Sequence, residues 1–430
     1  MANESAMITR IEAENFRCLR YANQPLGRFH VLIGPNASGK TTFLDVIGFL
    51  GRMVASGPEA AAMERASNFM DLLWNRQGEW FELAVEAAIP EHIQNKLNNA
   101  FGVFRYEVRV GLDPATHELG ILDEKAWLRP VKDSKAEADA RQLDLFPAEP
   151  AVPDSVITGK AKPKWQRVLS KAYGGNDNFY VEARDPGSGK GWFPSIRLGP
   201  RKSALANIPE DEIKFPASTW FKRMLMDGVQ HFSLNSRLIR QASPPNQGRG
   251  MKPDGSNLPW VIRDLSEAKN RQRFEWWIEH LRTALPDIES IRAREMEDTR
   301  HCYLIIRYKG GLEVPSWMAS DGTLRLLALT ILAYVPDSDG ILLVEEPENG
   351  IHPRAIETMF QSLSSVYGAQ VLLATHSPVI LSVAQPESVL CFNKAPSGAS
   401  DIVVGSRHPA LRAWKGEVDL GTLYAGGVLG

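Results

Sequence analysis

A glycine-rich segment, GPNASGKT from Gly34 to Thr41, has the residue types and the spacing that suit phosphate binding. Its glycines let backbone N–H groups curl around an anion, and a following helix would offer its positive N-terminal end. In this pattern Lys40 would reach the β- and γ-phosphates of a nucleotide, and Thr41 would bind Mg²⁺. The apolar segment FHVLI precedes the loop and the helical pattern TTFLDVIGFL follows it. This context favours a phosphate site over a plain glycine-rich turn.

Two adjacent carboxylates, Glu345 and Glu346, follow the apolar segment ILLV. A buried strand that ends in this way would bring Glu345 beside the phosphate loop to support Mg²⁺, while Glu346 would polarise an attacking water. Neighbouring side chains on a strand point to opposite faces, so we expect a bend at Pro347 to re-aim the second acid. The alternative, two solvated acids at a strand end, is weakened by the phosphate loop in the same chain.

A histidine, His376, follows the apolar segment VLLAT and stands two residues before Pro378. We expect it at the carboxyl edge of a sheet, where open α/β sheets bind their ligands. There it would contact a γ-phosphate and sense its loss. The alternative is an ordinary structural polar residue.

The segment SDGT, Ser320 to Thr323, opens the apolar helical pattern LRLLAL. Ser320 suits a helix N-cap, which is the simpler interpretation. The functional interpretation is a helix start that binds the γ-phosphate held by a second subunit, through the hydroxyl, the backbone N–H groups and the helix dipole.

These motifs require a sheet to position them, and the chain alternates strand and helix patterns in the required places. Strands are expected at 7–16, 27–34, 80–89, 104–112, 302–308, 340–346, 370–377 and 388–393, with helices between the later ones. Such alternation predicts an α/β fold with a mixed or parallel sheet around the phosphate loop and an N-terminal antiparallel part. We divide the chain into an N-terminal part of the ATP-binding head, a mostly helical and partly flexible insertion, a C-terminal part of the head and a tail, at 1–128, 129–224, 225–395 and 396–430.

Residues 131–163 are rich in Lys, Asp, Ala and Pro and predict a long exposed or partly disordered segment. Basic residues beside Trp165 could grip a nucleic-acid backbone, although a solvated segment is the favoured interpretation. These residues are Lys160, Lys162, Lys164, Arg167 and Lys171, and a shorter run of Arg237, Arg240 and Arg249 is equally ambiguous. A second Gly-Ser-Gly-Lys at 187–190 lacks the flanking strand and helix and is interpreted as a turn.

The composition excludes few protein classes. A net charge of −2 shows no global nucleic-acid footprint, and 430 residues suggest two or three lobes. The three cysteines have no metal-ligand spacing, and neither a signal peptide nor a membrane span is evident, so a cytoplasmic protein is expected.

The four motifs, in this order, resemble the ABC-type ATPase superfamily, and more narrowly the SMC/RecF/OLD group. The opening ITRIEAENFRCLR with LGRFHVLIGPNASGKTTFLDVI is similar to that group's N-terminus, EEPENGIHP and THSP resemble its Walker B/D-loop and switch histidine, and KPDGSNLPWVIRDL resembles a segment before its signature helix. The resemblance implies ATP and Mg²⁺ as cofactors, with Glu346, His376 and Lys40 catalytic and with Thr41 and Glu345 at the metal. It implies nucleotide contacts from Arg17, Asn36, Ala37, Ser38, Gly39, Lys40, Thr41 and Thr42, and in trans from Ser320 and Gly322.

The sequence departs from the group's pattern in two places. Glu345 stands where an Asp is usual, and Ser-Asp-Gly-Thr replaces Leu-Ser-Gly-Gly-Gln. Gln77 is a candidate for the glutamine loop.

The resemblance implies a slow ATPase that dimerises around ATP. About 35 residues follow SVLCFN, too few for a TOPRIM nuclease domain, so we expect a stand-alone ATPase acting in antiphage defence with a separately encoded nuclease or toxin. The alternatives are a RecF-like DNA-repair ATPase, a transporter motor, which the signature argues against, and a non-hydrolysing scaffold. The glycine-rich tail VDLGTLYAGGVLG either docks on a partner or, as favoured here, packs on its own sheet.

Overall fold

The computed structural model of the chain describes residues 7–130, 146–160, 162–183, 195–247, 250–336, 340–411 and 418–429. The Gly-Ser-Gly-Lys turn at 187–190, Arg249 and the segment 131–145 lie outside these residues.

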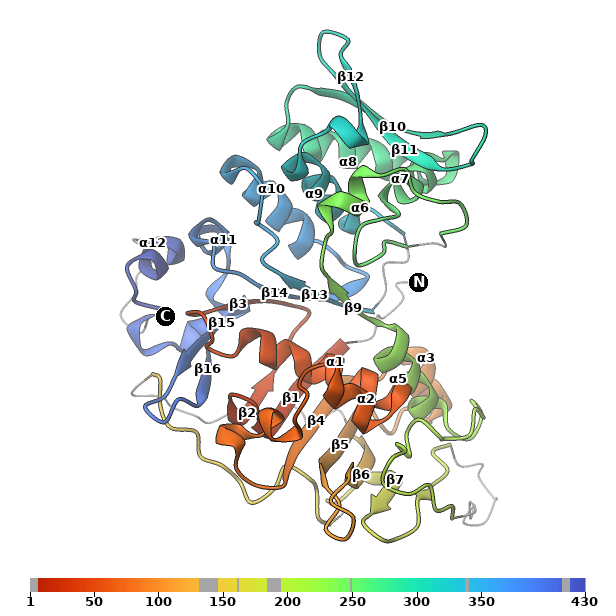
Figure 1. Cartoon of the computed structure of the whole chain (residues 1–430), viewed down its shortest axis with the longest axis vertical. Coiled ribbons are helices and arrows are strands. Elements are labelled where there is room, and N and C mark those ends of the chain that lie inside the picture. The colour runs from red at the N-terminus through yellow and green to blue at the C-terminus, as the bar shows by residue number, and fades with distance from the viewer. Residues whose placement is uncertain are drawn as a thin grey trace.

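An antiparallel sheet of seven strands, in the order β2-β1-β4-β5-β6-β7-β8, forms the lower part of the molecule in Figure 1. Its long strands place alternate side chains on opposite faces, one toward the core and one toward a layer of charged residues. The strands are β1 (Met7–Phe16), β2 (Leu19–Pro25), β4 (Trp80–Ala88), β5 (Val103–Leu112), β6 (Leu119–Arg129), β7 (Gln166–Ala172) and β8 (Asn178–Phe179).

A second sheet of six strands, in the order β16-β15-β3-β14-β13-β9, carries the chemical motifs. Its strands are parallel except for β16, which pairs antiparallel with β15. Because parallel strands end at the same edge, the segments that follow β3, β13 and β14 meet there. The strands are β3 (Phe29–Ile33), β9 (Val229–Phe232), β13 (Gly340–Glu345), β14 (Ala369–Ala374), β15 (Val389–Lys394) and β16 (Ser400–Val404).

An upper lobe, inserted between β9 and β13, combines a three-stranded antiparallel sheet with helices (Figure 1). Its last helix, α9, begins directly after Ser320. The lobe contains α6 (Ser236–Arg240), α7 (Leu258–Ser266), α8 (Arg271–Ala284), α9 (Asp321–Thr330), β10 (Ile288–Glu295), β11 (Cys302–Tyr308) and β12 (Glu313–Pro315).

The six-stranded sheet separates two hydrophobic cores. Leu32, Leu343 and Leu372 face the helix after the phosphate loop and the antiparallel sheet, whereas Val31 and Val371 face the helices on the other side. Central parallel strands are apolar on both faces for this reason. The remaining helices are α1 (Lys40–Ser56), α2 (Pro58–Met63), α3 (Glu91–Lys96), α5 (Pro216–Asp227), α10 (Pro353–Ser364), α11 (Pro378–Val383) and α12 (Leu420–Ala425). Short 3₁₀ turns lie at Phe69–Leu72, Trp74–Arg76, Ala268–Asn270, Ser316–Met318, Ile331–Ala333, Pro386–Ser388, Gly405–Arg407 and Pro409–Leu411.

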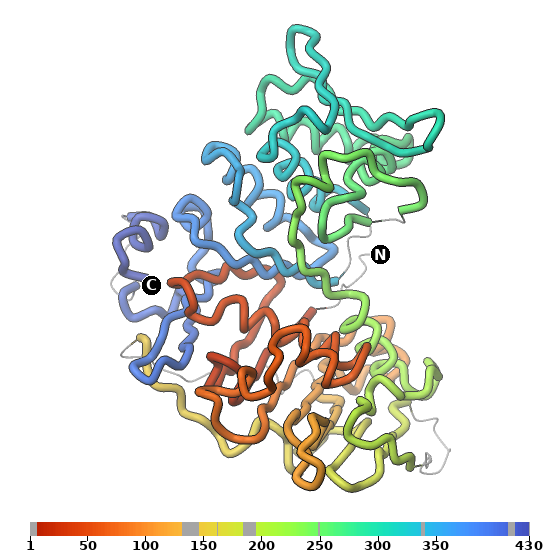
Figure 2. Tube along the Cα trace, viewed as in Figure 1, coloured from red at the N-terminus to blue at the C-terminus, as the bar shows by residue number. Residues whose placement is uncertain are grey.

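The path of the chain in Figure 2 shows the N-terminal (red) and C-terminal (blue) parts meeting at the six-stranded sheet. Strand β3 from the N-terminal part lies between β14 and β15 from the C-terminal part. The expected α/β class, with a mixed sheet and an N-terminal antiparallel part, is confirmed.

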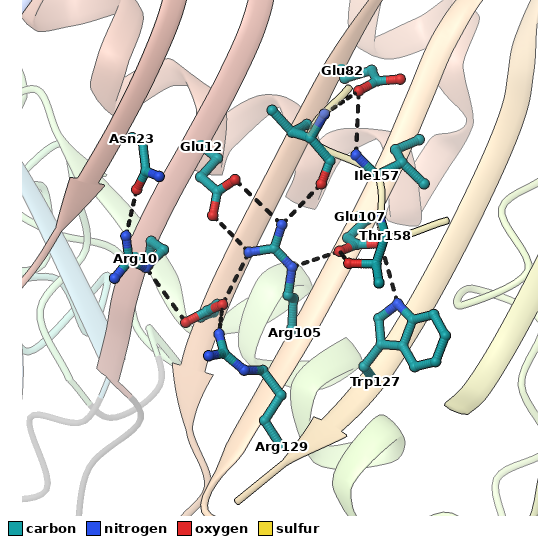
Figure 3. A network of polar contacts seen from close by, with 12 residues as sticks. Arg10, Glu12, Asn23, Glu82, Arg105, Glu107, Trp127, Arg129, Ile157 and Thr158 are labelled. Carbon is teal, nitrogen blue, oxygen red and sulfur yellow. Dashed lines mark hydrogen bonds and ion pairs between the residues drawn. The ribbon is translucent and has the colours of Figure 1, made fainter. Parts of the chain in front are cut away.

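The segment 155–158 differs from the exposed segment that its composition predicts. Val156 and Ile157 are buried, and the backbone N–H of Val156 donates to Glu82 Oε2 at 2.7 Å. Arg105, whose side chain is also buried, donates to Glu12 and Glu107, as Figure 3 shows. It also donates to Glu86 and to the carbonyl of Val156. Charges that pair with one another can be buried, so a polar composition here does not indicate solvation.

The expected helical character of the insertion 129–224 is also wrong for most of its described residues. Its segment QRVLSKA forms β7, which extends the antiparallel sheet beside β6. Val168 and Leu169 are buried, while Lys171 is buried in an ion pair with Asp177 at 2.7 Å. That pairing lets a polar strand lie inside the fold. Helix α5 begins only at Pro216.

None of the helices in the described residues is long and apolar enough to cross a membrane.

Candidate functional site

The phosphate loop needs left-handed backbone at three of its residues. Gly34, Ala37 and Gly39 have φ angles of 143°, 61° and 106°. A Cβ atom on Gly34 would lie 2.1 Å from the carbonyl oxygen of Phe392, so that position admits only glycine. Gly39 is the N-cap of α1, and the helix therefore begins at Lys40 with its free N–H groups at the loop.

The side chain of Lys40 lies over the loop. Its Nζ donates to the carbonyls of Gly34 at 2.8 Å and Pro35 at 3.1 Å. Burial lowers the Lys40 pKa to about 8, although Glu346 and Glu345 act in the opposite direction. The two carbonyls thus hold the ammonium group where an anionic ligand would take it over.

Glu345 is held from two sides at the end of β13. Thr41 Oγ1 donates to Glu345 Oε2 at 2.6 Å, and His231 Nε2 lies 3.0 Å from Glu345 Oε1. The hydrogen bond from His231 is the main reason that the Glu345 pKa lies below its usual value. An ionised carboxylate beside a hydroxyl is the kind of oxygen pair that Mg²⁺ prefers. The described residues contain no group of three or more His, Cys, Asp or Glu side chains suited to hold a metal by themselves.

Glu346 turns the chain at once, which corrects the expected bend at Pro347. Its φ of 46° is left-handed, and its N–H donates to the carbonyl of Ala374 at 2.8 Å. The left-handed residue re-aims its own side chain, so no later bend is needed. Asn349 Nδ2 then donates to Glu346 Oε2 at 2.5 Å.

His376 follows β14 and is held by a second acid and by the tail. Glu348 Oε1 accepts from Thr375 Oγ1 at 2.5 Å and from the N–H of His376 at 3.2 Å. The His376 Nδ1 atom lies 3.3 Å from the hydroxyl of Tyr424, which is also 3.3 Å from the carbonyl oxygen of Gly34. Burial and then the Lys40 charge lower the His376 pKa, so the neutral imidazole is favoured.

A cavity of about 440 Å³ joins these motifs at the sheet edge. It contains Lys40 and Thr41 of the loop, both acids and His376, and Arg17 lies on its wall with Nη1 3.3 Å from Asp45 Oδ2. The lining residues are Arg17, Cys18, Asn36, Ala37, Ser38, Gly39, Lys40, Thr41, Thr42, Glu345, Glu346, Ala374, His376 and Lys394.

The helix start at 320–323 is placed apart from this cavity in the same chain. Ser320 is the N-cap of α9, with its hydroxyl accepting from the N–H of Thr323 at 3.1 Å, and it is exposed. Gly322 packs against the loop that follows the acids, since a Cβ atom there would lie 2.4 Å from the carbonyl oxygen of Gly350. Neither Ser320 nor Gly322 lines the cavity described above.

Three residues of the site were missed by sequence reasoning. His231 lies at β9, the edge strand beside β13, and no local pattern marks it. Tyr424 comes from the tail helix, almost fifty residues beyond His376. Glu348 could have been found as a third acid directly after the expected pair. The glutamine-loop candidate Gln77 is exposed and does not line the cavity.

The possible nucleic-acid grip around Trp165 is largely built into the fold. Trp165 is buried. Its ring centroid lies 4.3 Å from Arg129 Cζ and 4.8 Å from Lys162 Nζ. Lys171 is paired with Asp177, as described above, and Arg240 is paired with Asp321 at 2.6 Å. The aromatic face and two of the cations are therefore already engaged.

The tail packs on its own domain, as the favoured interpretation expects. Helix α12 lies beside α11 (Figure 1), and Leu420 and Leu429 are buried in the core on that side of the sheet.

Two family models match the chain. One, described as "AAA domain, putative AbiEii toxin, Type IV TA system", matches residues 223–382 and includes Ser320, both acids and His376. The other, described as "AAA ATPase domain", matches residues 7–77 and includes the phosphate loop.

Among curated proteins, the chain is 46% identical over 41 residues to an OLD nuclease of Thermus scotoductus. That match covers 10% of this chain and spans only 8% of the length of the relative.

Similar solved structures include an Smc head bound to the C-terminal winged-helix domain of ScpA, with a TM-score of 0.49, 15% identity, and 92% and 97% of the two chains covered. An Smc head with an extended coiled coil, bound to a ScpA domain derived from Pyrococcus furiosus, has a TM-score of 0.46, 14% identity and 93% and 96% coverage. The SMC head domain from Thermotoga maritima has a TM-score of 0.43 and 12% identity, with 92% of this chain and 98% of that chain covered.

The two family models enclose the phosphate loop, the paired acids and the histidine that the fold brings to one cavity. The parts of the chain that form this cavity are therefore similar to AAA-type ATPase domains.

Proposed function

We propose that the chain binds ATP with Mg²⁺ and hydrolyses it to ADP and phosphate. The observation that carries this proposal is the single cavity shared by Lys40, Thr41, both acids and His376. A phosphate-binding loop without carboxylates would support binding alone, whereas an acid beside the loop supports activation of water.

The residues present fit Mg²⁺. Thr41 Oγ and the ionised Glu345 carboxylate already meet at 2.6 Å and would hold the ion. The buried Ser38 hydroxyl has no hydrogen-bond partner among the described residues, which leaves one unmet polar group on the loop for a ligand. When bound, the ion would offset the negative charge of the phosphates.

Each remaining side chain has a role that its position suggests. Lys40 exchanges its contacts with the Gly34 and Pro35 carbonyls for phosphate oxygens. Glu346, fixed by Asn349, accepts the proton of the water whose oxygen attacks the γ-phosphorus, and ADP leaves. His376 contacts the γ-phosphate from the neighbouring strand end.

The test is phosphate release from Mg·ATP by the pure protein. Glu346→Gln should lower kcat by about 10²- to 10⁴-fold while ATP still binds, because the amide cannot take the proton. Lys40→Ala should lose ATP binding, measured by a fluorescent ATP analogue.

Glu357→Gln is the matched control, because Glu357 is exposed on α10 and accepts from Gln361 at 3.1 Å, away from the cavity. Wild-type turnover in Glu346→Gln would overturn the assignment of the catalytic acid. ATP binding without turnover by the wild-type protein would favour a nucleotide-binding scaffold.

We further propose that two copies complete each site, with Ser320 and the helix start at Gly322 of one copy reaching the γ-phosphate of the other. The support is that Ser320 is exposed and lies at the start of α9, where N–H groups and the dipole favour an anion.

At the level of biological role, we propose a nucleotide-driven switch in bacterial antiphage defence that acts with a separately encoded effector. The support is the toxin–antitoxin description of one family model and the short likeness to an OLD nuclease. Protection of a bacterial host against phage should be lost in Lys40→Ala. Unchanged protection in that variant would contradict the role.

A RecF-like ATPase that binds DNA is the alternative role. The structure weakens this alternative, because Trp165 is buried and Lys171 is paired with Asp177, so neither is available to a nucleic acid. ATP-dependent binding of duplex DNA that weakens steeply with salt would restore it.

A further inference from the structure

The tail helix α12 lies outside both family models and yet reaches the phosphate loop. The two models end at residues 77 and 382, whereas α12 spans Leu420–Ala425. A Cβ atom on Gly421 would lie 2.1 Å from the carbonyl oxygen of Pro378, so α12 packs backbone against backbone on the start of α11. Since α11 begins two residues after His376, this packing fixes the tail directly beside the histidine.

The hydroxyl of Tyr424 makes two contacts that only one arrangement of protons satisfies. It lies 3.3 Å from the carbonyl oxygen of Gly34 and 3.3 Å from His376 Nδ1. The phenol has one proton and the carbonyl can only accept. Both bonds form only when Tyr424 donates to Gly34 and His376 Nδ1–H donates to the Tyr424 oxygen.

This arrangement fixes the tautomer of a neutral imidazole. With the proton on Nδ1, the Nε2 atom of His376 is a hydrogen-bond acceptor. His376 lines the cavity with Glu346, and because Nε2 cannot donate to a phosphate oxygen, its contact with the γ-phosphate runs through a water molecule that donates one proton to Nε2 and the other to the phosphate.

We propose that Tyr424 is a positioning residue, which holds His376 in the Nδ1–H tautomer and ties it to the phosphate loop through Gly34. The proposal deepens the hydrolysis proposed above and rests on it for its effect on rate. Burial raises the Tyr424 pKa, in keeping with a hydroxyl that stays protonated.

The first test leaves Tyr424 unchanged. In protein labelled with ¹⁵N-histidine, the shifts of the two ring nitrogens distinguish the tautomers, and loss of one signal pair in His376→Gln assigns the residue. The Nδ1–H tautomer is expected at a pH where the ring is neutral. An Nε2–H tautomer in the wild-type protein would overturn the proposal whatever the ATPase activity is.

The second test is Tyr424→Phe, which keeps the ring and removes the hydroxyl. The expected result is a loss of about tenfold in kcat with KM for ATP unchanged, the size of one hydrogen bond, together with a changed His376 tautomer. Adding Tyr424→Phe to His376→Gln should cause no further loss.

Tyr334→Phe is the matched control, because the Tyr334 hydroxyl also lies close to a histidine, 2.7 Å from His280 Nδ1, but outside the cavity. Wild-type kcat and tautomer in Tyr424→Phe would overturn the proposal. If the wild-type protein binds ATP without turnover, the proposed hydrolysis fails instead, and the tautomer still decides the role of Tyr424.

Discussion

At the scale of single residues, the site is a set of side chains that hold one another before any ligand arrives. Glu345 is held by Thr41 on one oxygen and by His231 on the other. Glu348 holds the backbone of His376 and the hydroxyl of Thr375. Such contacts reduce the freedom that binding would otherwise have to remove.

His231 gives a prediction at this scale, because partners of a metal-binding carboxylate orient it. His231→Ala should raise the Mg²⁺ concentration for half-maximal ATP hydrolysis by roughly ten- to a hundredfold. His231→Gln, which retains a donor, should lose less. A titration of activity with Mg²⁺ measures both. His301→Ala is the control, because His301 is a partly exposed residue of the upper lobe whose Nδ1 lies 3.0 Å from the Thr299 carbonyl. An unchanged Mg²⁺ requirement in His231→Ala would remove His231 from the site.

At the scale of elements, buried acids organise the lower lobe. Helix α5 has no side-chain cap of its own at Phe215. Glu182 supplies one, since its carboxylate accepts from the N–H of Ala217 at 2.6 Å and of Ser218 at 3.0 Å. Burial is the main cause that raises the Glu182 pKa to about 7 from 4.5.

A pH dependence of stability follows from Glu182. Below about pH 4.5 the carboxyl is protonated in both the folded and the unfolded chain, so its ionisation does not change the free energy of unfolding. As the pH rises toward 7, the unfolded chain ionises first, and the folded state loses roughly 3 kcal/mol relative to it. The loss is complete above pH 7.

Glu182→Gln should remove this pH-dependent loss of stability, because the amide does not ionise. The difference in free energy of unfolding between the wild type and the variant, from urea titrations at pH 5 to 8, should therefore shift in favour of the variant with rising pH. Glu212→Gln is the control, since Glu212 is half-exposed and pairs with Arg223. A difference that stays constant with pH would show that Glu182 is not protonated in the folded protein.

The elements also show what sequence can and cannot predict. The phosphate loop, the acids and His376 were predictable because each follows its own apolar strand, and a parallel sheet brings such ends together. His231 and Tyr424 were not predictable, because their places depend on which strand lies at the sheet edge and on where the tail packs. The segment at 155–158 was misjudged because pairing, which composition does not reveal, decides whether charges are buried.

At the scale of the whole molecule, the prediction concerns the number of copies. Glu346→Gln should bind ATP without turnover and so double its mass in light scattering with Mg·ATP, if the exposed start of α9 completes the site of a second copy. Ser320→Arg in the same background should remain monomeric, because the larger cation would block the helix start. Arg271→Ala, in an exposed pair with Glu275, is the control.

A mass that is unchanged by ATP would contradict this prediction. If the protein is already a dimer without ATP, a constitutive interface holds the copies together. If it remains a monomer with ATP, Ser320 does not act in trans on its own.

The close approach of Gly322 to Gly350 has a mechanical consequence. A Cβ atom on Gly322 would lie 2.4 Å from the carbonyl oxygen of Gly350, so there is no room for a side chain between the two backbones. The loop that follows Glu346 and the first turn of α9 are therefore in direct backbone contact, and we expect a displacement of one to be transmitted to the other. A change at Glu346 would in this way reach the exposed start of α9 at Ser320, on the surface of the molecule.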